Sequence, residues 1–394
     1  MIILDRPYVS EELKQYLSLT QVPVLKNDTA LRCRKNSALN IVSEERFLQL
    51  YAQGRRLYTC SENSIDWIVR NIRDEKLLGC IERMKDKALF RELLAPAYPD
   101  FFFRQATLEE LPELDPDRFS YPFVLKPKVG FFSVGVYPII CKDDWDAALF
   151  DLTSQADDWK KSYPTSVVNT EFILEQYVYG EEFAIDAYYD ENGEAVVLNI
   201  LKHDFGGITD VSDRLYYTGK SIIEQYLDLL STWLTEVNRY FKITDFPFHA
   251  EVRIDNGRIT PIEFNPMRFA GWCCTDISCF AFGFYTYDYY YGRQKPDWSS
   301  LLKGKDGKHY TFIILDKSNV EIDSDEFDYD AACWNFGKVL CLRKIDFHQH
   351  PIYGFAFTEI DENDERTRRR ITETNFDLFA QNVNRTKKTA IKTR

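Results

Sequence analysis

Residues 248–268 read FHAEVRIDNGRITPIEFNPMR, and this stretch predicts a hairpin of two β-strands. Asn256-Gly257 in its middle is a strong signal for a tight turn, because both turn positions need a left-handed backbone that Asn and Gly adopt readily. Apolar residues alternate with polar ones on either side of the turn, from Ala250 to Ile254 and from Ile259 to Phe264. The hairpin therefore indicates an antiparallel sheet with one buried face.

Three oxygen-bearing side chains lie on this hairpin. Glu251 and Glu263 fall on facing strands, and Asn265 shares the face of Glu263 because strand side chains alternate with a period of two. Two carboxylates and an amide oxygen on one face form a set of hard ligands that suits Mg²⁺ shared with phosphates. A structural ion pair of the two glutamates with Arg253 is the alternative.

An earlier stretch, YPFVLKPKVGFFSVGV at residues 121–136, places Lys126 at the end of a predicted strand. The loop behind it carries Gly130, Ser133 and Gly135, and the glycines let backbone N–H groups fold over phosphate oxygens. One fixed positive charge beside such a loop suits a nucleotide. An ordinary hairpin with a surface lysine is the alternative.

Residues 174–182, LEQYVYGEE, predict a strand end, an apolar hinge and a turn. The exposed hinge backbone can pair with an adenine edge, and Glu182 can accept the hydroxyl groups of a ribose. A turn with two solvated glutamates is the alternative. Farther upstream, Asp86-Lys87 begins a predicted helix with Asp86 as its N-cap, where a surface lysine is the ordinary expectation.

These pieces together resemble the ATP-grasp superfamily, over about residues 86 to 290. The order is Asp-Lys at 86, Lys-Pro-x-x-Gly-x-x-Ser-x-Gly-Val at 126, Glu-x-x-Val-x-Gly-x-Glu at 175, and Glu251 followed by Glu-x-Asn-Pro at 263. Each motif is loose, but their order along the chain makes the signal strong. The chain departs from the family pattern at Met267, which separates Pro266 from Arg268.

The resemblance implies roles for residues that meet ATP. Lys87 and Lys126 would contact the phosphates, and Ser133 lies in the phosphate loop. The adenine would be held by Glu175 and by the backbone of Gln176, Tyr177 and Val178, and Glu182 would bind the ribose.

The resemblance also implies a metal site and two catalytic side chains. Glu251, Glu263 and Asn265 would bind two Mg²⁺ ions, with Mn²⁺ as an alternative metal. Lys202, at the end of the predicted strand 196–201, would face the γ-phosphate, and Arg268 would reach the phosphate or the acyl group.

The fold class that we predict is α/β: an ATP-grasp fold with a small lid subdomain and a larger antiparallel-sheet subdomain. An N-terminal α/β domain precedes them, and a C-terminal α+β appendage with a polar helix at 363–381 follows. The predicted segments are 1–83 for the N-terminal domain, 84–175 for the lid, 176–296 for the metal-bearing subdomain and 297–394 for the appendage. A long helix is expected from Ser221 to Phe241, with Ser221 and Glu224 as a capping box.

Composition and net charge limit the classes of partner and the cell compartment that we expect for this protein. A formal net charge of −13 repels phosphate backbones and argues against nucleic acid, although the tail from Arg385 to Arg394 is locally basic. Nine cysteines without CxxC spacing fit a reducing cytoplasm, and no apolar run is long enough to span a membrane.

The expected reaction is ATP-dependent joining of a small-molecule carboxylate to an amine through an acyl phosphate, with release of ADP. A carboxylase or phosphotransferase on the same scaffold is one rival, and an ATP-binding sensor without turnover is another. The sequence identifies neither the acid nor the amine, and it leaves a homodimer open.

Overall fold

A computed structural model describes the chain except for residues 130–134, 163–170, 208–211, 318–323, 325 and 382–394. The chain divides into two compact units. Unit 1 comprises Met1–Ile200, Tyr226–Asp276 and Tyr285–Pro296, and unit 2 comprises Leu201–Gln225, Ile277–Phe284 and Asp297–Arg394. This division differs from the four segments expected from the sequence, whose boundaries stay a prediction.

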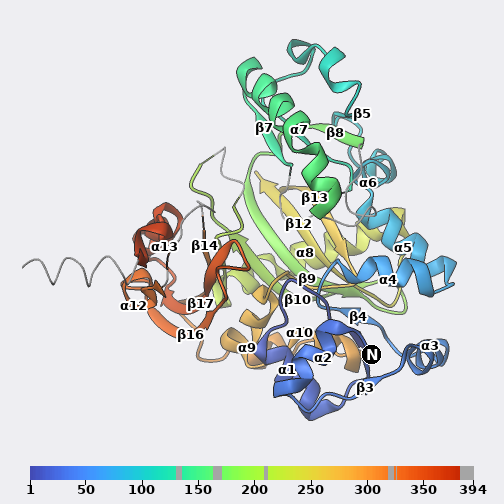
Figure 1. Ribbon diagram of the computed structural model, residues 1–394, viewed down its shortest axis with the longest axis vertical. Coiled ribbons are helices and arrows are strands. Elements are labelled where there is room, and N and C mark those ends of the chain that lie inside the picture. The colour runs from blue at the N-terminus through green and yellow to red at the C-terminus, as the bar shows by residue number, and fades with distance from the viewer. Residues whose placement is uncertain (130–134, 163–170, 208–211, 318–323, 325, 382–394) are drawn as a thin grey trace, which may run out of the picture. The chain divides into compact units, whose positions relative to one another are not determined.

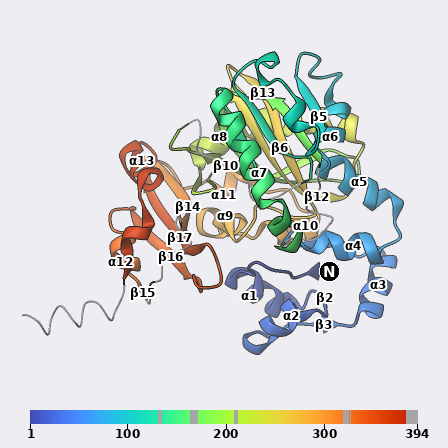
Figure 2. The ribbon, with the colours of Figure 1, turned by 45° about the horizontal axis from the view of Figure 1, so that its top comes forward.

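The N-terminal part of unit 1 is a small parallel sheet with the strand order β3-β2-β1-β4. Parallel strands need crossover connections, and helices supply them here (Figure 2). The strands are β1 (Ile2–Ile3), β2 (Val24–Leu25), β3 (Ile41–Val42) and β4 (Tyr58–Thr59), and the helices are α1 (Glu11–Thr20), α2 (Asp28–Cys33), α3 (Glu44–Ala52) and α4 (Ser64–Asn71). The side chains of Ser10, Asn27 and Ser43 cap the first three helices. This is the α/β unit that the sequence predicts.

A second sheet of unit 1 is antiparallel, with the order β5-β8-β6-β7. Its strands are β5 (Phe103–Thr107), β6 (Phe123–Pro127), β7 (Tyr137–Ile139) and β8 (Glu171–Gln176). Helix α7 (Lys142–Ser162) covers one face (Figure 1), where its Trp145 and Leu152 share a core with Phe123 and Leu125 of β6. Because side chains alternate along β6, Phe123 and Leu125 both point into this core. Lys126 follows them near the end of the strand.

The third sheet of unit 1 carries the predicted hairpin, in the order β13-β12-β9-β10. Its strands are β9 (Glu181–Tyr189), β10 (Ala195–His203), which runs on into unit 2, β12 (Phe246–Asp255) and β13 (Arg258–Pro266). The turn is as predicted, since Asn256 and Gly257 have φ angles of +48° and +81°.

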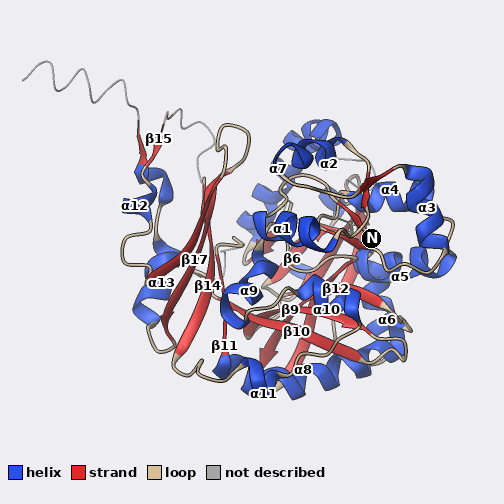
Figure 3. Cartoon of the chain, turned by 90° about the horizontal axis from the view of Figure 1, so that it is seen from below, coloured by secondary structure: helices blue, strands red, loops and turns tan. Residues whose placement is uncertain are grey.

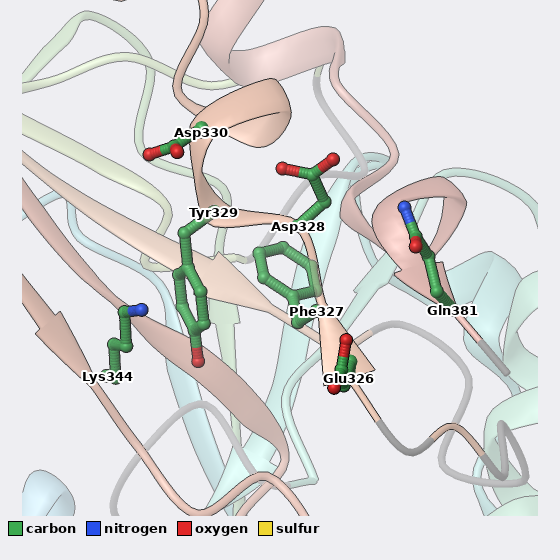
Figure 4. A pocket seen from close by; sticks show the side chains of 7 residues that line it. All are labelled: Glu326, Phe327, Asp328, Tyr329, Asp330, Lys344 and Gln381. Carbon is green, nitrogen blue, oxygen red and sulfur yellow. The ribbon is translucent and has the colours of Figure 1, made fainter. Parts of the chain in front are cut away.

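Helices pack on both the third sheet and the N-terminal sheet. Helix α8 (Lys220–Phe241), whose part from Tyr226 onward belongs to unit 1, lies along the third sheet (Figure 3). Helix α5 (Glu75–Lys85) is followed directly by α6 (Lys87–Leu94). The ring centre of Phe90 in α6 lies 5.4 Å from the ring centre of Phe264 on β13. In α10 (Thr286–Gly292) Tyr287 is buried, and its ring centre lies 4.8 Å from that of Tyr16 in α1. The contact between Phe90 and Phe264 holds α6 beside the hairpin, and the contact between Tyr287 and Tyr16 joins α10 to α1.

Unit 2 contains the end of β10 and an antiparallel sheet in the order β11-β14-β17-β16. These strands are β11 (Leu215–Gly219), β14 (Lys308–Asp316), β16 (Lys338–Lys344) and β17 (Ile352–Asp361), and a separate pair is β15 (Glu326–Phe327) with β18 (Ala380–Gln381). The helices are α9 (Ile277–Phe282), α11 (Trp298–Leu301), α12 (Tyr329–Ala332) and α13 (Glu365–Glu373).

Two helix predictions need correction. The polar helix expected at 363–381 ends at Glu373, because Thr374 is extended and the side chain of Asn375 caps a new 3₁₀ turn at Phe376–Phe379. The capping box expected at Ser221 is also wrong, because α8 begins at Lys220 and the Ser221 hydroxyl lies 3.4 Å from Nε2 of His309. Among the described residues, no helix combines the length and the apolar character that a bilayer crossing needs.

Candidate ATP and metal site

The two hairpin glutamates face each other across the strands. Glu251 of β12 pairs directly with Glu263 of β13, and Asn265 Nδ2 donates to Glu263 Oε1 over 3.1 Å. Burial and the neighbouring Glu263 both raise the pKa of Glu251. The predicted metal-binding side chains therefore converge on one spot, where like charges repel unless a cation joins them.

Lys87 brings a positive charge to the same spot. Asp86 caps α6 by accepting from the N–H groups of Ala88 and Leu89 over 3.0 and 3.1 Å, so Lys87 is held at the first helical position. Its Nζ lies 2.9 Å from Glu263 Oε2, and its side chain is only 11% exposed, so it is not an ordinary surface lysine. Burial would raise the pKa of Glu263, but Lys87 and Lys126 outweigh it and hold that pKa well below its usual range.

Lys126, at the end of β6, is buried and forms an ion pair with Glu175 of β8. The guanidinium of Arg91 binds the other carboxylate oxygen, with Nε 2.9 Å from Oε2. Burial alone would raise the pKa of Glu175, but these two cations lower it to about 2. Burial lowers the pKa of Lys126 despite Glu175, and Arg91 and Lys87 lower it further. The Glu175 carboxylate thus serves two cations, and its assignment to adenine stays a prediction.

Arg91 is a residue that the sequence reasoning missed. It follows Lys87 by four positions on α6, so the two side chains share a helix face. Besides Glu175, its guanidinium donates to the carbonyl oxygens of Pro261 over 2.7 Å and Ile262 over 3.3 Å. Arg91 therefore ties the second sheet to β13. The four-residue spacing on an expected helix was the signal that could have found it.

The predicted hinge lies between β8 and β9. The backbone N–H of Tyr177 donates to Pro122 over 3.3 Å, and the carbonyl of Val178 accepts from Arg253. Arg253, the alternative partner for the hairpin glutamates, forms its ion pair with Glu182, whose Oε2 lies 2.9 Å from Nε. Gly180 has a φ of +114°, and a Cβ there would stand 2.4 Å from the carbonyl oxygen of Ile254. The hinge thus turns against β12 at a position that only glycine fits.

Gln176, the first hinge residue, is anchored to the segment before β5. Its backbone N–H donates to Phe102 over 3.1 Å, and its side-chain Oε1 accepts from the N–H of Phe102 over 2.9 Å. This anchoring fixes the start of the hinge rather than presenting the Gln176 side chain to a ligand.

Three predicted residues lie away from the contacts described above or outside the described residues: Arg268, Lys202 and Ser133. Arg268 is buried after β13 and binds Glu62. Lys202 belongs to unit 2, where it pairs in register with Tyr217 of β11. Ser133 lies outside the described residues.

His249 is a second residue that was missed. It stands two positions before Glu251 on the same face of β12, with Nε2 3.6 Å from Glu251 Oε1 and Nδ1 2.8 Å from Asp186 Oδ1. Asp186 is fully buried and also accepts from Thr275 Oγ1 over 2.7 Å. Burial lowers the pKa of His249, but the two carboxylates outweigh it and raise that pKa to about 9. The strand period could have marked His249, whereas nothing local pointed to Asp186.

The donor set suits a metal held jointly with a nucleotide. In the part of the chain that the structure describes, no group of three or more His, Cys, Asp and Glu side chains is placed to hold a metal ion. Two carboxylates and one amide oxygen are too few for a metal site made of protein alone. Mg²⁺ is commonly bound through one or two carboxylates plus phosphate oxygens and water, and Glu251, Glu263 and Asn265 fit that pattern.

Glu175→Gln is expected to lower the free energy of unfolding by about 3 kcal/mol near neutral pH, because Arg91 and Lys126 then lose their buried counter-charge. The folded-state pKa of about 2 lies below the ordinary value of 4.5. The Glu175 carboxylate therefore makes its full contribution to stability above the ordinary pKa of 4.5. This contribution is lost as the pH falls from 4.5 toward the folded-state pKa of about 2. Urea denaturation should show a wild-type advantage that shrinks below about pH 4.5. An advantage that stays constant down to about pH 3 would contradict the buried ion pair.

Comparisons with known proteins give a family match for part of the chain and similar folds for most of it. Residues 119–276 match a family model described as an ATP-grasp domain. The fold is similar to that of the L-amino acid ligase from Bacillus licheniformis, with a TM-score of 0.64 and 16% identity, covering 96% of this chain and 97% of that chain. It is also similar to the N5-carboxyaminoimidazole synthetase from Staphylococcus aureus, with a TM-score of 0.59 and 13% identity, covering 95% and 96% of the two chains.

A third similar structure is the biotin carboxylase domain dimer of the Hydrogenobacter thermophilus 2-oxoglutarate carboxylase, in complex with MgADP and bicarbonate. Its TM-score is 0.58 at 11% identity, and the match covers 91% of this chain and 86% of that chain. A search of curated protein sequences finds no match. Residues 119–276 of the chain therefore match an ATP-grasp domain, and the chain shares the fold of these three structures.

Proposed function

We propose that this protein is a Mg²⁺-dependent ligase that activates a carboxylate with ATP and couples it to an amine, releasing ADP and phosphate. The convergence of Glu251, Glu263 and Asn265 beside Lys87 is the observation that carries the proposal. Carboxylates for a metal and a lysine for a phosphate are the two partners that a Mg²⁺–nucleotide complex requires.

The charges at the site neutralise each other in pairs, Lys87 with Glu263 and Lys126 with Glu175. Phosphate oxygens would give both lysines a second anionic partner. Glu251, Glu263 and Asn265 would hold the metal, which neutralises charge on the transferring phosphoryl group when it is bound. Buried lysines stabilise that charge more strongly than exposed ones, because little water screens them.

The nucleoside would lie against the hinge. We assign the adenine to the backbone at Gln176, Tyr177 and Val178, and the ribose to Glu182. Glu182 is held by Arg253, whose guanidinium also lies 5.0 Å from the centre of the Tyr177 ring. That contact supports a shared role for the hinge and Glu182. Glu175, in contrast, would act by holding Lys126.

The acid half of the reaction needs a cation for an anionic substrate. A carboxylate resists nucleophiles until phosphorylation supplies a leaving group, and Arg268 is the side chain that we assign to the acid or its acyl phosphate. Lys202 remains a candidate contact for the γ-phosphate. The name of the similar L-amino acid ligase makes amino acids the first acids and amines to test.

The MgADP complex of a similar structure supports ATP with Mg²⁺, and the number of ions and the use of Mn²⁺ stay predictions. That structure is a dimer, which supports testing a homodimer here. The nine cysteines are thiols rather than disulfides, which fits a reducing cytoplasm.

A carboxylase is the second candidate, because two of the similar structures are named for carboxylation of biotin or of an aminoimidazole. Such an enzyme would phosphorylate bicarbonate rather than an organic acid. A sensor without turnover is a third candidate, although it would not require a charged metal site beside the phosphate lysines.

The test is an incubation of the purified protein with ATP, Mg²⁺, hydroxylamine and pools of amino acids and other organic acids. Hydroxylamine is a small nucleophile that is uncharged at neutral pH, so it can replace the amine. The proposal expects a hydroxamate with the correct acid, together with ADP. AMP in place of ADP would overturn the proposal, since it indicates adenylation. ADP formed with bicarbonate alone would favour the carboxylase, and bound ATP without turnover would favour the sensor.

A further inference from the structure

A buried ion pair joins the N-terminal α/β part of unit 1 to the end of the hairpin. Glu62 lies in the turn between β4 and α4, and Arg268 lies two residues beyond the end of β13. Nε and Nη2 of Arg268 approach the same oxygen of Glu62, Oε1, at 3.0 and 2.5 Å. The exposed fractions of Glu62 and Arg268 are 5% and 9%, so water screens the pair weakly.

The guanidinium is held in orientation as well as in position. Nη1 of Arg268 donates to the carbonyl oxygen of Phe269 over 2.9 Å, which adds a third contact at a different edge. A guanidinium carries five N–H groups, and these contacts use three of them. The geometry leaves two donors of a fixed cation for an anionic ligand.

The backbone below Arg268 is fixed too. Met267, the residue that departs from the family pattern, has a φ of +67°, a left-handed conformation that costs free energy for a residue with a side chain. Its N–H donates to Pro247, and its carbonyl accepts from the N–H of Thr59, both over 2.9 Å. Bonds to β12 and β4 therefore hold the extra residue in a turn and set the direction in which Arg268 leaves the strand.

The second oxygen of Glu62 connects this pair to the phosphate lysine. Oε2 of Glu62 forms an ion pair with Lys85, which is the last residue of α5 and precedes Asp86-Lys87. Burial would raise the pKa of Glu62, but Lys85 and Arg268 outweigh it and lower that pKa to about 2, so the carboxylate stays ionised. Glu62 thus bridges the chain segments that carry Lys87 and Arg268.

We propose that Glu62 is a positioning residue for Arg268: it fixes the guanidinium so that the two remaining donors meet the carboxylate substrate or its acyl phosphate. This inference rests on the proposed ligase function. Glu62 itself takes no part in the chemistry and acts through Arg268.

A double-mutant cycle tests the link. Glu62→Gln keeps the size of the side chain but removes its charge, and it is expected to lower kcat for acid-dependent ADP release by about tenfold or more while ATP affinity stays within about twofold. In an Arg268→Ala background the same change should cost less than about twofold, because the group through which it acts is gone. Glu62→Asp, which keeps the charge, should recover part of the rate. Glu45→Gln, an exposed change in α3, is the control with unchanged activity.

A measurement that needs no turnover separates this inference from the proposed function. The Nε–H of Arg268, identified by NMR through its loss in Arg268→Lys, should exchange slowly with water in the wild type and rapidly in Glu62→Gln. Lys85→Met removes the other partner of Glu62, and it should leave that exchange slow. Equal exchange in wild type and Glu62→Gln, or fully additive losses of kcat, would overturn the positioning role. Wild-type protein that releases no ADP with any acid would count against the ligase instead, and the exchange rates would still test Glu62.

Discussion

Glu263→Gln is expected to reduce acid-dependent ADP release by about a hundredfold or more at saturating Mg²⁺. The Glu263 carboxylate faces Glu251, accepts from Asn265 and pairs with Lys87, so in the proposed site its charge would serve both the metal and Lys87. The amide keeps the shape of the side chain and removes the charge. Metal affinity and the position of Lys87 should therefore both suffer, while the hairpin remains.

The control for this variant is Glu194→Gln, which alters an exposed glutamate in the loop before β10 and should leave the rate unchanged. Thermal unfolding of both variants checks that the fold persists. Near-normal turnover of Glu263→Gln at saturating Mg²⁺ would remove Glu263 from the metal site. An increase in the Mg²⁺ concentration required for half-maximal rate is the more specific expected sign.

Lys126→Ala is expected to weaken ATP binding or slow phosphoryl transfer by about 3 kcal/mol, the scale of one buried group that stabilises developing charge. Lys126 is almost fully buried in its ion pair with Glu175, and its pKa is lowered chiefly by burial. Arg91 still neutralises Glu175 in the variant, so Lys126→Ala should lose less stability than a variant that removes the carboxylate. The loss should appear in calorimetric ATP affinity or in the single-turnover rate.

Lys128→Ala is the matched control, since Lys128 lies two residues farther along the chain. It pairs with Asp86 over 3.1 Å and with Glu171 over 3.2 Å in a more exposed setting. Ion pairs of this kind contribute about 0 to 1 kcal/mol, so the control should lose at most about fivefold in affinity or rate. If Lys126→Ala keeps both its nucleotide affinity and its rate, Lys126 does not contact phosphate.

The sequence predicts the hairpin that carries Glu251 and Glu263 well, because every determinant of the hairpin is local. Asn256-Gly257 specifies the turn, the turn sets the register, and the register places Glu251 opposite Glu263. The strand period then puts Asn265 beside Glu263, where the hydrogen bond confirms the shared face. Only a bulge after Glu251 was not expected, since bulges leave little trace in a single sequence.

The ion pairs around the hairpin could not be predicted in the same way, because they join residues far apart in the chain. Arg91 and Glu175 are separated by 84 positions, and Glu62 and Arg268 by 206. Such pairs depend on how sheets and helices pack, which side-chain periodicity does not encode. The shortened helix at α13 is a local failure of another kind: residues 374–381 mix polar and apolar side chains as a helix can, but Asn375 favours a new cap.

Transfer of an oxygen label tests the acyl phosphate most directly. The acid found with hydroxylamine is prepared with ¹⁸O in its carboxylate and incubated with unlabelled ATP, Mg²⁺ and the amine. If the enzyme phosphorylates that carboxylate, one labelled oxygen should appear in the inorganic phosphate for each molecule of product, and ADP should remain unlabelled. Unlabelled phosphate at full product formation, or label in AMP, would contradict the account.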